Sequence, residues 1–385
     1  MKKKAILPSM IIILGCMTTA AVLFIQQKHH GNHEHNTYIA QNHSLRPLFN
    51  VNRDVNLTEK ITIGAVGDIL IHTPIYQDAF NGAVYNFDPM FDPIKSILEK
   101  PDIVSANQES IVGGVELGLS GYPRFDSPHQ VADALVHSGV DIVSTANNHA
   151  LDKGEKGIRS ESAYLDQIGL PHVGTFIDPM DRQRLRIINK NGIKVAFLSY
   201  TYGTNGIPIP KGKDYLVNVL NKNVMKAEIG RAKSSADVVV MSIHWGNEYQ
   251  RIPSNEQKDL AQFLADAGVD VIFGSHPHVL QPMGWIKTTD GRKSFVIYSL
   301  GNFISGQRGK YKDIGGLATI DITKQINTQG SKIEISNPVF TPSYVTSQKN
   351  KSFRVVPLEK AETYGLKNAH VKYEEIQKHM YQWIP

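Results

Sequence analysis

The chain has 385 residues, 41% of them apolar, and its 41 basic and 36 acidic residues leave a formal charge of +5. This length is enough for one large domain or two ordinary domains with a substantial core. The basic residues are spread along the chain and form no aromatic-laced basic stripe, which argues against nucleic acid as a partner.

The N-terminus predicts a membrane anchor over residues 1–26. Lysines at 2–4 precede an uncharged, mainly apolar stretch over 5–25, which has about the 20 residues that a membrane-spanning helix needs. With these lysines inside, we expect a single-pass protein of the cell membrane whose main domain is extracellular. Cys16 lies in "IILGCM", which is similar to a bacterial lipobox, so anchoring through a lipid on Cys16 is the alternative.

The next segment, 27–59, is polar and rich in histidine, has no hydrophobic period and predicts a tether. Histidine-rich tracts can bind metal adventitiously, but a flexible segment does not fix the geometry of its ligands. We therefore assign no specific metal site to this segment.

From residue 60 onward, short β-branched runs alternate with helical patterns, which predicts an α/β core. After about residue 315 strand patterns follow one another without helices, so we expect 316–385 to extend the domain of 60–315 with antiparallel strands. The predicted strands are 61–70, 102–110, 140–150, 193–200, 237–246, 269–278 and 294–304. The predicted helices are 91–100, 129–139, 155–169, 226–236 and 256–268.

Polar side chains gather at the carboxyl ends of five predicted strands, where ligands bind in open α/β sheets. Each has an ordinary structural explanation by itself, such as a helix cap or a satisfied core histidine. The pair His276 and His278 is harder to explain in that way, because Pro277 stiffens the link between the two imidazoles. The residues are Asp68, Asn107, Glu109, Asn147, Asn148, His149, His244, His276 and His278.

Mixed nitrogen and oxygen ligands suit Mn, Zn or Fe better than Ca or Mg. A bound metal would lower the pKa of a water molecule and polarise a phosphoryl or carbonyl oxygen. His149, next to Asn148, could then donate a proton to the leaving group. The residues themselves therefore predict metal-dependent hydrolysis as the reaction class.

Six motifs in order, "GDIL", "NQES", "ANNHALD", "HWGNEY", "GSHPHV" and "YSLGNF", resemble the CapA (PgsA) family of bacterial poly-γ-glutamate capsule-biosynthesis proteins over residues 61–305. The family's domain is in turn similar to calcineurin-like metallophosphatases, which implies a four-layer αββα sandwich with a metal centre between its two sheets. The resemblance implies His149 as the proton donor. The metal ligands that it implies are Asp68, Glu109, Asn148, His244, His276 and His278.

The chain departs from the phosphatase pattern at two positions. Leu70 stands where phosphatases place a histidine, and His72, two residues further, would point elsewhere along a regular strand. Ala150 stands where an acid usually follows the proton donor, with Asp152 as an alternative acid. The sequence therefore leaves open whether the site holds one ion or two.

The resemblance implies a membrane-anchored extracellular component of poly-γ-glutamate biosynthesis or export, with a metal-dependent hydrolase-like domain. Its implied partners are the membrane, a membrane-embedded synthase complex, and poly-γ-glutamate or another anionic polymer. Two alternatives stay open: an exported metallophosphoesterase unrelated to capsule, and a non-enzymatic binding or transport module on the same fold. Catalytic activity is therefore left open by the sequence.

Overall fold

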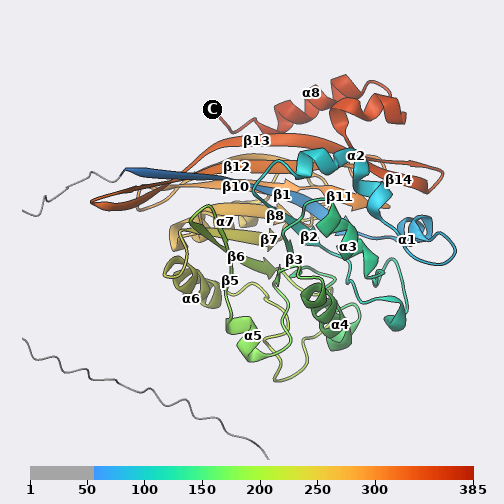
Figure 1. The fold of residues 1–385 in the computed structure, drawn as a ribbon, viewed down its shortest axis with the longest axis horizontal. Helices are drawn as coiled ribbons and strands as arrows, with labels where there is room; N and C mark the ends of the chain where they lie inside the picture. Colours follow the sequence, from blue (N-terminus) through green and yellow to red (C-terminus); the bar gives the residue numbers. More distant parts are fainter. Residues whose placement is uncertain (1–55) are drawn as a thin grey trace, which may run out of the picture. The chain divides into compact units, whose positions relative to one another are not determined.

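The computed structural model describes residues 56–385, so the predicted membrane anchor over 1–26 and nearly all of the predicted tether over 27–59 lie outside the described residues. Within the described part, no helix is long and apolar enough to cross a membrane. These residues form two β-sheets with helices packed against them (Figure 1), which confirms the predicted α/β class.

The first sheet is organised around β1 (Leu57–Leu70), which pairs in parallel with β2 on one side and antiparallel with β12 on the other. Its order is β14-β13-β12-β1-β2-β3-β4, and β11 pairs with the end of β1. The other strands of this sheet are β2 (Ile103–Gln108), β3 (Ile142–Ser144), β4 (His172–Val173), β11 (Asn302–Ser305), β12 (Ile314–Asn327), β13 (Gly330–Gln348) and β14 (Lys351–Pro357).

The second sheet has a parallel centre and antiparallel edges. Strands β6, β7, β8 and β10 run parallel, whereas β5 and β9 pair antiparallel at the two edges. In spatial order the strands are β5 (Arg186–Lys190), β6 (Ile193–Thr201), β7 (Val238–His244), β8 (Val271–Ser275), β10 (Lys293–Leu300) and β9 (Leu280–Lys287).

The helices confirm all five predicted positions and add several that the patterns did not indicate. For example, α7 begins with a capping box between Ser254 and Gln257 and ends at Gly268, whose φ is +119°. The helices are α1 (Thr73–Ala79), α2 (Asp88–Leu98), α3 (Gln130–His137), α4 (Gly154–Gln167), α5 (Pro179–Gln183), α6 (Lys222–Lys233), α7 (Asn255–Ala267) and α8 (Ala369–Met380). Two 3₁₀ segments are η1 (Val115–Leu117) and η2 (Leu358–Tyr364).

Three apolar clusters define the layers. Side chains such as Ile63 of β1 and Val240 of β7 fill the space between the two sheets. A second cluster joins the first sheet to α1, α2 and α3, and a third joins the second sheet to α6 and α7. The layers thus run helix, sheet, sheet, helix. Because each fully buried aliphatic side chain stabilises by about 1.5–3 kcal/mol relative to exposure, this packing fixes the two sheets against each other.

One predicted strand is wrong in an informative way. The pattern over 294–304 predicts a single strand, but the chain turns at Gly301, whose φ is +64°, so that β10 belongs to the second sheet and β11 to the first. A Cβ atom at Gly67 of β1 would lie 1.9 Å from the carbonyl oxygen of Gly301. Two glycines therefore permit this close crossing, which no periodicity could reveal.

Candidate metal centre

Glu109, directly after β2, is a fully buried carboxylate whose two oxygens have no hydrogen-bond partner. A buried carboxylate without hydrogen bonds is strongly unfavourable, and buried charges in proteins are normally hydrogen-bonded or bound to a metal. Burial, and next the charge of Asp68, raise the pKa of Glu109 well above its usual value. The orphaned oxygens of Glu109 therefore indicate a position for a cation.

Glu109 belongs to both of the groups of residues that could hold a metal ion among residues 56–385. Asp68, Glu109 and His278 form one group, and Glu109, His244 and His276 form the other, with the ligand atoms of each group within 4.8 Å of one another. Glu109 Oε1 lies 3.6 Å from His244 Nε2 and 3.7 Å from His278 Nε2. Since atoms bound to one ion at about 2.0–2.2 Å are themselves about 3–4 Å apart, Glu109 could serve as a ligand in either group.

Asp68 is oriented by the neighbouring strand. The pairing register of β1 changes next to Asp68, both with β2 and with β11. Asn107 of β2, opposite Asp68, donates from Nδ2 to Asp68 Oδ1 at 2.8 Å. The other oxygen, Oδ2, lies 3.0 Å from His278 Nδ1. At the irregular end of β1, Asp68 Oδ2 thus faces His278, another member of the first group.

The His-Pro-His segment after β8 has a strained backbone. His276 has a φ of +96° and His278 a φ of +58°, and such values cost about 1–3 kcal/mol each for residues other than glycine. Neighbours hold this conformation: Tyr249 N donates to Pro277 O at 2.7 Å, and Asn302 Nδ2 donates to His278 O at 3.3 Å. The strain places both imidazoles at the same centre, with ring centroids 5.8 Å apart.

Burial and the carboxylates set the protonation of the three histidines. Burial lowers the pKa of His244 well below its usual value and that of His276 to about 4, so both are neutral at neutral pH. Burial would also lower the pKa of His278, but Glu109 and Asp68 raise it to about 9. Because metals bind neutral imidazole, His244 and His276 could bind a cation as they are, whereas His278 would first have to lose a proton.

Asn148 follows β3 of the first sheet and lies next to the second group. Its Oδ1 lies 2.7 Å from His244 Nε2, and its Nδ2 donates to Asn205 Oδ1 at 3.1 Å. His244 Nδ1 lies 3.0 Å from Ser275 Oγ, which fixes the other side of the ring. Asn148 is therefore placed to supply an amide oxygen beside Glu109 and the imidazoles.

Asn302 of β11 is a site residue that the sequence analysis missed. Its Nδ2 has three acceptors, His278 O at 3.3 Å, Gln307 Oε1 at 3.1 Å and Lys312 O at 2.8 Å. These acceptors fix the orientation of the amide, so that Oδ1 faces His278 Nδ1 at 3.1 Å. The first group thus has a further oxygen although Leu70 supplies no ligand. The available signal was the motif "YSLGNF", in which Asn302 follows a strand end.

His149 and Asp152 form a separate buried pair at the edge of the centre. His149 Nδ1 lies 2.7 Å from Asp152 Oδ2, to which Phe125 N also donates at 2.6 Å. The Phe125 ring meets the His149 imidazole edge-on, with 4.7 Å between centroids. His149 also lines a cavity of about 290 Å³ together with Asn148. With Nδ1 engaged, Nε2 is the ring nitrogen left for a ligand in that cavity.

The remaining polar residues at the strand ends have structural roles. Asn147 donates to Gln108 O at 2.7 Å and accepts from His149 N at 2.9 Å, which shapes the loop after β3. His72 follows β1, lies 3.2 Å from Gly306 N through its Nδ1 and packs against Phe125. His72 is a member of neither metal group among the described residues.

The donor set fits divalent cations. The six ligands predicted from the sequence lie at one place, all buried, and draw on both sheets. Carboxylate, amide and imidazole donors together suit a first-row transition metal, and the unpartnered oxygens of Glu109 and the unpartnered Nδ1 of His276 are polar atoms that a cation would satisfy.

The fold and the site together define an α/β protein of two sheets with a candidate divalent metal centre at the ends of strands from both. The family model of the bacterial capsule synthesis protein PGA_cap matches residues 62–307. The chain belongs to this family, as its motifs predict.

Two curated relatives come from Bacillus. The chain is 31% identical over 259 residues to the capsule biosynthesis protein CapA of Bacillus anthracis, covering 65% of this chain and 61% of that protein. It is 29% identical over 241 residues to the PGA biosynthesis protein CapA of Bacillus subtilis strain 168, covering 57% of each. The match thus spans about three fifths of the length of these relatives.

Solved structures with partial similarity include two phosphoesterases. The calcineurin-like phosphoesterase YfkN from Bacillus subtilis is 17% identical, with a TM-score of 0.44 over 83% of this chain and 99% of that chain. A 5'-nucleotidase precursor from Thermus thermophilus is 12% identical, also with a TM-score of 0.44, over 83% of this chain and 59% of that chain.

Proposed function

We propose that this chain is a component of bacterial poly-γ-glutamate capsule synthesis or export whose family domain is a metal-dependent hydrolase. Membership of the capsule synthesis family supports the capsule role, as do the names of the two Bacillus relatives. The lysines and apolar stretch at the N-terminus support a single-pass membrane anchor with the domain outside the cell. A membrane-embedded synthase complex and the anionic polymer are the proposed partners.

The observation that carries the hydrolase proposal is the position of Glu109 between two ligand groups. Divalent cations such as Mn, Zn or Fe bound there would act as Lewis acids and lower the pKa of a water molecule. One ion would be held by Asp68, Glu109, His278 and Asn302, and the other by Glu109, Asn148, His244 and His276.

The chain's own residues supply the proton for the leaving group. His149 lines the cavity beside the ligands, and Nε2 is its free ring nitrogen, so an imidazolium there donates to the atom that leaves. Asp152 holds the Nδ1 proton and stabilises the charged ring, and Phe125 fixes both through its backbone N–H and its ring. This assigns a role to Asp152 in place of the acid absent at Ala150.

Metal stoichiometry tests the proposal directly. The purified full-length chain, offered Mn, Zn and Fe without chelator, is expected to hold two ions per chain. Glu109→Gln removes both, since Glu109 is common to the two groups, whereas His276→Ala and His278→Ala each leave one. His137→Ala, which removes an exposed histidine of α3, is the matched control and retains both ions.

Activity is measured on the same samples, with phosphoesters and poly-γ-glutamate as substrates. Turnover is expected to follow the metal content of the variants. A native chain that holds no metal under these conditions contradicts the proposed centre, and a metal-loaded chain without turnover on either substrate contradicts the hydrolase.

A further inference from the structure

The cavity that His149 lines, of about 290 Å³, is built from loops of both sheets. The long loop after β2 contributes Tyr122 and Arg124, the loop after β6 contributes Asn205, and the loop after β7 contributes Glu248. A ligand in this cavity therefore lies beside the proposed proton donor and between loops that the two sheets position separately.

Two opposite charges line this cavity without forming an ion pair with each other. Ser120 Oγ donates to the backbone oxygen of Arg124 at 2.6 Å, but the Arg124 guanidinium forms no ion pair or hydrogen bond among residues 56–385. Within the same described residues, Glu248 forms no ion pair either, so no Arg124 nitrogen lies within 4.0 Å of its carboxylate oxygens. Both exposed charges thus line one cavity without an ion pair between them, so both are free to contact a ligand there.

The loop that carries Arg124 is anchored rather than free. Lys153 Nζ donates to Gly118 O at 2.8 Å, and Ser120 and Asp126 exchange two backbone hydrogen bonds of 3.1 and 2.9 Å. Phe125, next to Arg124, donates to Asp152 Oδ2. The backbone at Arg124 is therefore fixed relative to His149, so a ligand has to order the Arg124 side chain but not the loop that carries it.

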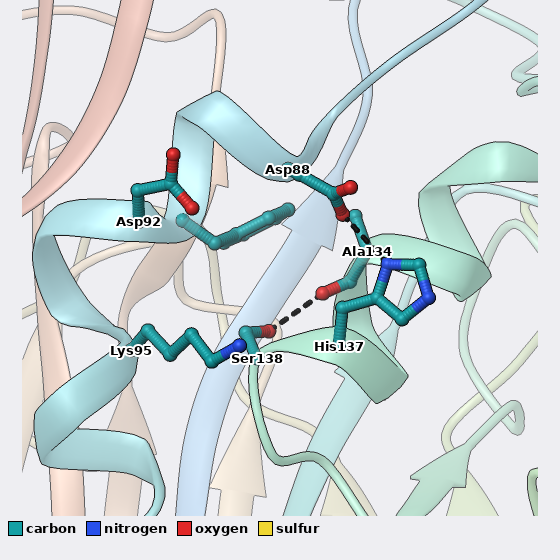
Figure 2. A pocket seen from close by; sticks show the side chains of 7 residues that line it. Asp88, Asp92, Lys95, Ala134, His137 and Ser138 are labelled. Carbon is teal, nitrogen blue, oxygen red and sulfur yellow. Dashed lines mark hydrogen bonds and ion pairs between the residues drawn. The ribbon is translucent and has the colours of Figure 1, made fainter.

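A second cavity of similar size, remote from the candidate metal ligands, provides a comparison for the first. It measures about 300 Å³ between α2 and α3 and is lined by Asp88, Asp92, Lys95 and His137 (Figure 2). Its two cationic side chains have partners, since His137 Nδ1 lies 3.0 Å from Asp88 Oδ1 and Lys95 Nζ 3.8 Å from Glu99 Oε1. None of the candidate metal ligands lines it. This cavity serves as the internal control for the first.

We propose that the cavity beside the metal centre binds the zwitterionic head of an α-amino acid, with Arg124 on its carboxylate and Glu248 on its ammonium. A guanidinium binds a carboxylate through two parallel hydrogen bonds, and a carboxylate forms charge-assisted bonds with an ammonium. A ligand with only anionic groups would be attracted by Arg124 and repelled by Glu248. A zwitterion satisfies both.

This inference rests on the proposed function and names the part of the polymer that the site selects. In a γ-linked glutamate chain every residue keeps its α-carboxylate, but only the amino-terminal residue also keeps its α-ammonium. The cavity therefore selects the amino end of the chain over its interior. It also selects against simple phosphate esters, which have no ammonium.

Calorimetric titration of the full-length chain with tri-γ-glutamate tests the pairing of charges. Metal-free samples prevent turnover during the titration. Two modifications of the amino-terminal residue of the trimer are compared: acetylation of its α-amine and amidation of its α-carboxylate. Each is expected to weaken binding to the native chain about tenfold. Glu248→Gln is expected to be insensitive to acetylation, and Arg124→Gln to amidation. Lys95→Gln and Asp92→Asn, in the second cavity, leave every affinity unchanged.

Several results overturn the inference. One is equal affinity of the native chain for the free and acetylated trimers, which needs no variant to be interpreted. A second such result is competition of inorganic phosphate with the trimer that requires Arg124, together with tighter binding of phosphate to Glu248→Gln than to the native chain. That result would identify the cavity as an oxyanion site instead. Metal content, measured in parallel samples, separates the two proposals. If the variants respond to the modified trimers as expected but the chain takes up no metal, only the hydrolase is contradicted. If the chain takes up metal but the variants do not respond in this way, only the zwitterion site is contradicted.

Discussion

His149 and Asp152 are joined across 2.7 Å, Nδ1 to Oδ2, by side chains that are 8% and 1% exposed. In this position Asp152 stabilises a charged imidazole from three residues further along the chain. Asp152→Asn keeps an oxygen for Phe125 N–H but loses the charge. We expect hydrolysis to fall about 100-fold, within the range of general acid catalysis, with both ions retained. Unchanged turnover at full metal content would remove the proton-donor pair from the mechanism.

Glu109 is the residue on which metal-dependent stability should depend. Glu109→Gln removes a buried carboxyl group that has no hydrogen bonds, but it also removes the contact of 3.7 Å with His278, so we expect the free energy of unfolding of the metal-free variant to change little. The variant should, however, lose the rise in melting temperature that metal gives the native chain. Scanning calorimetry with and without chelator measures both effects. Glu334→Gln, at an exposed position of β13, is the control and should change neither.

Two asparagines are expected to act on different ions. Asn302 Oδ1 faces the group of Asp68 and His278, whereas Asn205 orients Asn148 toward His244. Asn302→Ala should therefore weaken one ion about 10–100-fold, and Asn205→Ala should weaken the other. Metal titrations in the His276→Ala background, which retains only the first ion, distinguish them. Loss of the same ion in both variants would contradict the assignment.

Glu161 of α4 gives the fold a pH dependence outside the metal centre. Burial raises the pKa of its carboxyl from 4.5 to about 8, while Val112 N donates to Oε1 at 3.1 Å. A folded pKa above the unfolded value contributes stability below about pH 4.5, and this is lost as the pH rises toward 8. We expect the native free energy of unfolding to fall by a few kcal/mol over this window, at about 1.4 kcal/mol per pH unit.

Glu161→Gln keeps the oxygen that accepts from Val112 and cannot ionise, so its stability should change far less between pH 5 and pH 8. Urea unfolding at the two pH values compares the variant with the native chain. An equal loss of stability in both would place the pH dependence elsewhere.

The sequence predicted those parts of the site that depend on local pattern. Apolar runs followed by Asp68, Glu109, Asn148, His244 and the His-Pro-His segment indicated both the strands and the residues that the structure brings together there, because a strand end is a local feature. The role of Asn302 could not be predicted, since it depends on a turn at Gly301 that moves β11 into the other sheet. The positive φ values of His276 and His278 likewise depend on contacts from Tyr249 and Asn302, which are distant in sequence.

The position of β1 constrains the order in which the molecule can be made. β1 is the first strand of the described chain, yet it lies between β2 and β12, so most of its second edge, Leu57–Val66, is covered only by residues of β12, from Ile314 onward. While the chain emerges from the ribosome, that edge stays open and able to pair with other chains. A chain that ends before Ile314 should therefore aggregate. The first sheet can be completed only after β12 has been synthesised.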